Sequence, residues 1–128
     1  MIAWTRQPVG EDVLALLGIL GDDADALMVA HVAVSQLAEL ARGYTRGAGF
    51  RTVITVDGNG AEITRQEVAT DLAGVIVLAG ARLSRNPEQA AYRATGGDNG
   101  ESFRGSFAGW TLAERAVLDR YRLRLGVA

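Results

Sequence analysis

One stretch of the sequence, residues 63–87, constrains the fold more than any other, because its start, its body and its end all indicate a single buried helix. Thr64 and Glu67 have the spacing of a capping box, and Ile63 and Val68 have the spacing of a hydrophobic staple. The body that follows is apolar on nearly all sides. In a soluble chain such a helix must be surrounded by other elements.

The same stretch carries a stop signal. Arg82 and Arg85 fall in its last turn, where cations complement the helix dipole, and Pro87 prevents continuation. Gly74 and Gly80 weaken the helix locally, so they predict the close approach of a neighbouring helix. The apolar run is far shorter than the roughly 20 residues that a bilayer span needs. We therefore expect a core helix and no membrane segment.

Composition excludes several kinds of chemistry. The chain has 128 residues, 48% of them hydrophobic, which predicts one domain over 1–128 with a real core. There is no cysteine, and all 13 basic residues are arginine, so disulfides, thiolate sites and Schiff-base lysines are excluded. A single histidine leaves no multi-histidine metal site, and we expect no cofactor. The net charge of −2 argues against a globally basic nucleic-acid binder.

Two further helices are predicted in the first third of the chain. Residues 11–17 form a short helix closed by Gly18, and residues 23–42 form a long one that packs along the 63–87 helix. The N-terminus lacks the apolar core of a secretory signal, which predicts a cytoplasmic site of synthesis. The inward face of the long helix comprises Leu27, His31, Val34, Leu37 or Ala38, and Ala41.

A final helix opens at Thr111, whose spacing to Glu114 repeats the capping box. Residues 51–56 have the β-branched composition of a strand followed by a tight turn, but with no strand adjacent in sequence an ordered loop is the alternative. A β-hairpin is predicted over 92–107. The fold class is therefore mainly α, a small bundle of about four helices with a β-hairpin or extended-loop excursion. The inward stripe of the final helix comprises Leu112, Ala116 or Val117, and Tyr121.

Most polar features have a structural interpretation that outweighs a functional one. His31 lies on an apolar stripe, which favours a satisfied core histidine over a catalytic base. Residues 57–62 are misplaced for an EF-hand calcium loop, which favours a solvated turn. Residues 43–49, flanked by Arg42, favour a helix C-cap over a phosphate cradle. The acidic pairs Glu11/Asp12 and Asp22/Asp23 are helix-start charges.

Four arginines on the final helix form the most informative polar feature. A solvated helix face explains them, because cations are favourable near a helix C-terminus. A docking surface explains them equally well, because arginine forms bidentate pairs with carboxylates and phosphates. Acidic residues interleave with them, which suits a protein partner better than DNA. The four are Arg115, Arg120, Arg122 and Arg124.

The C-terminal segment resembles a bacteriophage family. Residues 109–122 read GWTLAERAVLDRYR, close to the closing "GxTLAExAVLxRYR" pattern of the head-to-tail adaptor (head completion or connector) proteins of long-tailed phages. Two other segments match that family in the right order: residues 46–50, and residues 75–83 running into Asn86-Pro87. Glu11-Asp12-Val13 in the short first helix also fits, so the resemblance spans most of the chain.

The resemblance implies a structural virion protein that forms a twelvefold ring on the portal vertex and extends the DNA channel toward the stopper and tail. Its location would be the head–tail neck, after assembly in the host cytoplasm. The implied partners are the portal protein, the stopper or next neck ring, further copies of the chain, and passing DNA without sequence specificity. Portal contacts would involve Arg115, Arg120, Tyr121, Arg122 and Arg124, and contacts with neighbouring subunits or the next ring would involve Tyr92, Arg93, Phe103, Arg104 and Phe107.

Mild acidity suits such a conduit, because a strongly basic lumen would bind the passing duplex. Residues 51–59 look longer than the corresponding family loop, and their role is open. The first rival is a small DNA-binding regulator that uses the arginine-rich last helix. An enzyme is the third choice and has almost no sequence support.

Overall fold

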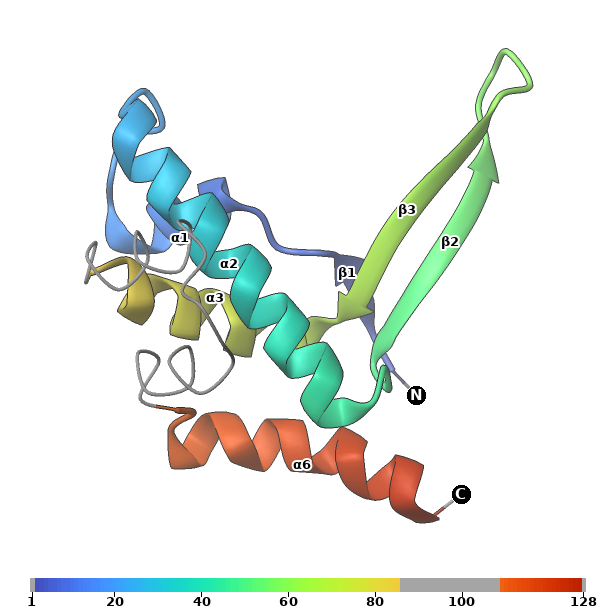
Figure 1. The fold of residues 1–128 in the computed structure, drawn as a ribbon. Helices are drawn as coiled ribbons and strands as arrows, with labels where there is room; N and C mark the ends of the chain where they lie inside the picture. The colour runs from blue at the N-terminus through green and yellow to red at the C-terminus, as the bar shows by residue number, and fades with distance from the viewer. Residues whose placement is uncertain (1, 86–108, 128) are drawn as a thin grey trace, which may run out of the picture.

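The computed structural model describes residues 2–85 and 109–127, with side chains described as far as residue 122. In this part of the chain four helices accompany a three-stranded antiparallel sheet of order β1-β3-β2, which confirms the predicted fold class (Figure 1). The hairpin predicted over 92–107 lies outside the described residues. The elements are β1 (Trp4–Arg6), α1 (Gly10–Leu17), α2 (Ala24–Thr45), β2 (Phe50–Val56), β3 (Glu62–Ala69), α3 (Thr70–Ser84) and α6 (Leu112–Val127).

The core lies where α1, α2, α3 and α6 meet, and α2 packs along α3 as predicted. A Cβ added at Gly80 would lie 3.1 Å from Val13 Cγ2, so the predicted close helix approach is confirmed there. The same prediction is wrong for Gly74, which is exposed and has nothing within 4 Å of an added Cβ. The largest fully buried side chains are Leu37, Leu72, Ile76, Leu118, Val13, Val68 and Thr45.

The helix-start carboxylates act as predicted. Asp12 Oδ2 accepts the Val9 amide at 2.8 Å, and Asp23 Oδ1 accepts the Ala26 amide at 3.0 Å. Each bond satisfies one amide that a helix start leaves without an intrahelical partner. Gly18 ends α1 in the left-handed region at φ 73°, and α2 runs one turn beyond its predicted end to Thr45.

The first third of the predicted 63–87 helix is instead β3, and this prediction is wrong. Thr64 pairs with Ile54 and Glu67 pairs with Arg51 across an antiparallel ladder, so the capping box between Thr64 and Glu67 does not form. Pairing with β2 satisfies the backbone polar groups of both segments at once, which a local capping signal cannot do. The helix therefore begins at Thr70.

The strand prediction for residues 51–56 is confirmed, and β3 is the partner that the sequence did not reveal. β2 and β3 form a two-stranded arm that projects from the helices, because β1 pairs only with Glu67, Val68 and Ala69 at its base (Figure 1). At the turn, Asp57 Oδ1 accepts the amides of Asn59 and Ala61 at 2.8 and 3.0 Å. This is the solvated turn that the sequence favoured.

Of the helices in the described ranges, α2 alone is long and apolar enough to cross a membrane by length and composition. The buried core helix of a soluble protein passes the same test. Here α2 packs against α1, α3 and α6, and its inward face includes Ala30, Ala33, Val34, Leu37, Ala38 and Ala41.

Candidate interaction surface on the C-terminal helix

The inner face of α6 is built around a buried carboxylate. Glu114 is 5% exposed and accepts two bonds from Arg82 of α3, at 2.8 and 3.0 Å. The predicted capping box is confirmed, since the Thr111 amide donates to Glu114 Oε1 at 2.9 Å and the Glu114 amide to Thr111 Oγ1 at 3.1 Å. One carboxylate thus caps α6 and joins it to α3.

This contact changes which residues of α6 face inward. Leu112 is 86% exposed, so the predicted stripe is wrong there. Of the alternatives Ala116 or Val117, Ala116 is exposed and Val117 packs partly buried against the core, and Tyr121 is buried as predicted. The fully inward residues of the described part of α6 are Glu114, Leu118 and Tyr121. A hydrophobicity pattern could not find this set, because its first member is charged and is buried only when Arg82 neutralises it.

The second half of α6 is held by two aromatic hydroxyls. Tyr121 donates to Asp71 Oδ1 of α3 at 2.5 Å, and Tyr44 of α2 donates to Asp119 Oδ1 at 2.5 Å. Arg120 Nη2 lies 3.4 Å from the other oxygen of Asp71, while the guanidinium of Arg122 lies 4.8 Å from the centre of the Tyr44 ring.

Three of the predicted arginines are exposed on α6. Arg115 is exposed and has no ion-pair partner among the described residues, while the Arg120 side chain is 63% exposed despite its contact with Asp71. Arg122 is also exposed. Tyr121 is 6% exposed and joins α6 to α3. Arg124 lies on α6 beyond the described side chains, and Tyr92, Arg93, Phe103, Arg104 and Phe107 lie outside the described residues.

The acidic side chains on α6 bind other side chains of the same protein. Glu114 is buried against Arg82, and Asp119 is half-buried and bonded to Tyr44. The exposed charged side chains on the described part of α6 are therefore all arginines, although the sequence alternates both signs. We define the outer arginine face as these three exposed arginines, Arg115, Arg120 and Arg122. Arg122 lies toward Tyr44 of α2 and Arg120 lies toward Asp71 of α3, so they flank the helix on two sides.

Sequence reasoning missed the residues that hold this face in place. Sequence reasoning identifies Arg82 only as a charge that complements the helix dipole and gives Asp71 no contact, whereas both residues join α3 to α6. Tyr44 was assigned to a turn, and it bonds Asp119 across 75 positions of sequence. Only Asp71 carried a signal, as an acidic residue within an otherwise apolar segment.

Burial of Glu114 favours its neutral form. The hydrogen bonds from Arg82 and from the Thr111 amide, together with the positive charge of Arg82, outweigh that effect of burial. The pKa of Glu114 is lowered below its ordinary value of 4.5. A carboxyl whose pKa is lower in the folded than in the unfolded state stabilises the protein fully above pH 4.5 and loses that contribution as the pH falls through the lowered pKa.

We expect Glu114→Gln to lower the free energy of unfolding at pH 7 by about 2 kcal/mol. Breaking a fully buried ion pair costs about 3–5 kcal/mol, but the Arg82 side chain is 42% exposed and water compensates part of the loss. Urea unfolding between pH 3 and pH 7 measures the effect. The difference in the free energy of unfolding between wild type and variant should shrink below pH 4.5. A constant difference from pH 3 to pH 7 would contradict the role of the Glu114 charge.

Among the described residues, the other candidate sites have structural roles. His31 is not a core residue, as its side chain is 48% exposed; it accepts the Gly10 amide through Nδ1 at 3.2 Å and so helps to cap α1. Arg46 ends α2 in the left-handed region at φ 57°, which is the predicted C-cap. No cluster of three or more metal-ligating side chains occurs within residues 2–85 and 109–122.

Comparison with known proteins identifies no relative of this chain. No family model, no curated protein and no solved structure matches it.

Proposed function

We propose that this protein is a subunit of the ring that connects the DNA-filled head of a tailed bacteriophage to its tail. The observation that carries the proposal is the outer arginine face, which lies within the segment that resembles the phage adaptors. The ring would sit beneath the portal in the head–tail neck, extend the DNA channel and receive the stopper or next neck ring. In this role α6 contacts the portal.

The anchoring of α6 supports a docking role. Leu118 is fully buried, and three polar contacts hold the helix to α2 and α3 over its described length: Glu114 with Arg82, Tyr121 with Asp71, and Asp119 with Tyr44. A surface held in this way loses little conformational freedom on binding, which favours affinity. Because arginine pairs bidentately with carboxylates, the expected counterpart is an acidic surface on the portal.

Binding to purified portal rings tests this function. We expect Arg115→Glu to weaken binding about tenfold or more, since it reverses an exposed charge of the outer arginine face without breaking a described ion pair. Arg65→Glu is the charge-reversal control. Arg65 is 56% exposed on β3, away from α6, and the variant loses a 3.5 Å contact with Glu67 but should leave portal affinity unchanged. Light scattering of mixtures measures the complex, and melting curves check that both variants fold.

Either of two results would overturn the portal assignment: portal rings that ignore the wild-type protein at low and physiological salt, or equal binding by Arg115→Glu and wild type. The same outer arginine face would serve the rival function, a DNA-binding regulator. Tight duplex binding by the free protein that weakens steeply with salt, and weakens further on Arg120→Ala and Arg122→Ala, would favour that rival.

A further inference from the structure

Within residues 2–85 and 109–127, no element covers the outer edge of the β2–β3 arm. β2 lies at the outside of the sheet, and its seven residues contain no proline, no glycine and a single charge, Arg51. Proteins usually protect such an edge with charges, prolines or a covering element, because its free backbone groups bind other strands. Among the described strands only β3 pairs with β2, and a two-stranded ribbon is marginally stable in water.

The ladder shows which backbone groups are free. The Ala69 amide donates to the Gly49 carbonyl at 2.8 Å, and the Asp57 amide donates to the Ala61 carbonyl at 3.0 Å. Antiparallel pairs alternate between bonded and non-bonded, so these two bonds fix the alternation between them. Thr52, Ile54 and Val56 therefore turn their N–H and C=O groups away from β3. The Ile54 and Val56 side chains are also exposed, at 61% and 67%.

We propose that the occupant of this edge is the β2 strand of a second copy, paired antiparallel about a twofold axis at Ile54. The two copies then form one six-stranded sheet of order β1-β3-β2-β2-β3-β1. In this register Ile54 faces Ile54 of the second copy, and apolar or hydroxyl side chains face each other around it. The flanking pairs are Thr52 with Val56 and Val53 with Thr55, each formed twice.

Charge complementarity selects this register and this partner. Centring the pair on Ile54 places Arg51 opposite Asp57 of the second copy at both ends, whereas centring it on Val53 or Thr55 leaves both residues facing uncharged positions. Arg51 and Asp57 each have one side-chain atom that is available for a further bond. Arg51 uses Nε and Nη2 for Glu67, and Asp57 uses Oδ1 for its turn, so within the described chain Arg51 Nη1 and Asp57 Oδ2 carry no recorded bond.

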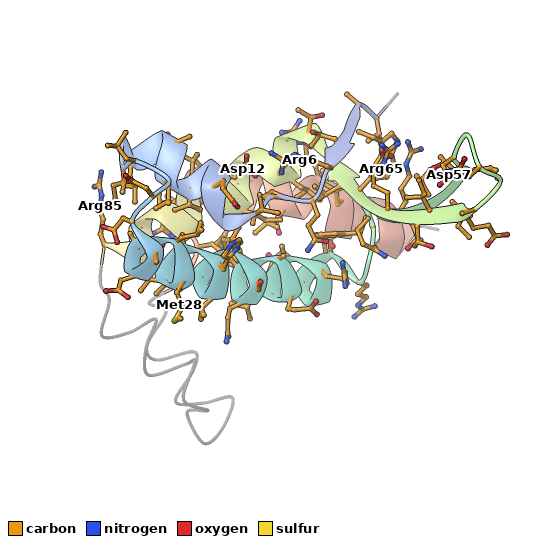
Figure 2. The ribbon with its side chains drawn as sticks, turned by 90° about the horizontal axis from the view of Figure 1, so that it is seen from above. Arg6, Asp12, Met28, Asp57, Arg65 and Arg85 are labelled. Carbon is orange, nitrogen blue, oxygen red and sulfur yellow. The ribbon has the colours of Figure 1, made fainter. Side chains whose placement is uncertain are left out.

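The arm is positioned for such pairing. It stands clear of the helices, with Asp57 far from the bundle, so the two bundles would lie at opposite ends of the shared sheet (Figures 1 and 2). A twofold contact produces a closed dimer. This dimer is the expected state of the free protein and does not depend on the adaptor function. Entry into a cyclic ring would require this pair to dissociate.

Charge reversal tests both the partner and the register. By sedimentation equilibrium the wild-type chain should be a dimer, and Arg51→Asp and Asp57→Arg should each weaken dimerisation about tenfold, because two like-charge pairs then face each other. Mixing these two variants restores opposite charges at both ends of a heterodimer. The mixture should therefore dimerise close to wild-type strength.

A second pair of variants guards against local damage to the arm. Ile54→Lys places two like charges at the twofold axis and should give a monomer, whereas Ile63→Lys, on the neighbouring strand with Ile63 47% exposed, should remain dimeric. A monomeric or ring-forming wild type, dimers unaffected by Ile54→Lys, or no recovery in the mixture would each overturn the proposal. Portal binding is scored separately, so the two proposals fail independently.

Discussion

Ile76→Asp is expected to abolish folding. Ile76 lies in the middle of α3, has 0% of its surface exposed and belongs to the core shared by the helices. An aspartate there would bury a charge without a designed partner, and such substitutions cost more than about 4 kcal/mol, a large part of the 5–15 kcal/mol that stabilises a domain. Circular dichroism and thermal melting measure the loss of the cooperative transition.

Leu78→Asp is the matched control for that experiment. It introduces the same side chain two residues later on the same helix, where Leu78 is 54% exposed, and should cost less than about 1 kcal/mol. Similar melting of the two variants would show that α3 is not oriented as the structure places it. A folded Ile76→Asp variant would remove α3 from the centre of the core.

Gly49→Ala is expected to destabilise the protein by about 3 kcal/mol. Gly49 has φ +84°, and a Cβ there would lie 2.4 Å from Leu72 Cδ1 and 3.0 Å from Tyr121 Cδ1. A left-handed conformation costs a non-glycine residue about 1–2 kcal/mol, and forcing a core side chain aside costs about 1–3 kcal/mol more. Urea denaturation gives the change in the free energy of unfolding.

Gly47→Ala separates these two terms. Gly47 has the same φ of +84°, but an added Cβ would meet nothing within 4 Å, so the backbone term alone remains. We expect this variant to lose about 1 kcal/mol. Equal losses for Gly47→Ala and Gly49→Ala would mean that Leu72 and Tyr121 do not pack against the Gly49 backbone.

Local signals in the sequence were sufficient for three of the helices. Asp23 and Gly18 marked boundaries within a residue or two, and the capping box of Thr111 and Glu114 formed as predicted. Such signals act between residues three or four apart, and the bonds that they form need no distant partner. The strand character of residues 51–56 was also evident, because β-branched side chains favour an extended backbone.

Similar local signals gave the wrong answer for residues 63–69. Thr64, Glu67 and Val68 have helix-start spacing, yet they pair with Ile54, Arg51 and Phe50 of β2. A capping box satisfies two amides, whereas the ladder satisfies the backbone of both strands along their shared length. The tight turn at 57–60 indicated that a second strand could follow residues 50–56, but the hydrophobic pattern at 63–81 already had a helical explanation.

The orientation of α6 was likewise decided by tertiary packing. Sequence alone determined that a capped, arginine-rich helix follows Thr111, and it identified Arg115, Arg120 and Arg122 as a candidate surface. Only the folded chain decided which side faces outward, since Glu114 enters the interior with Arg82 while Leu112 remains in water. Burying a charge is unfavourable until its partner is in place, and that partner lies 32 positions away on α3.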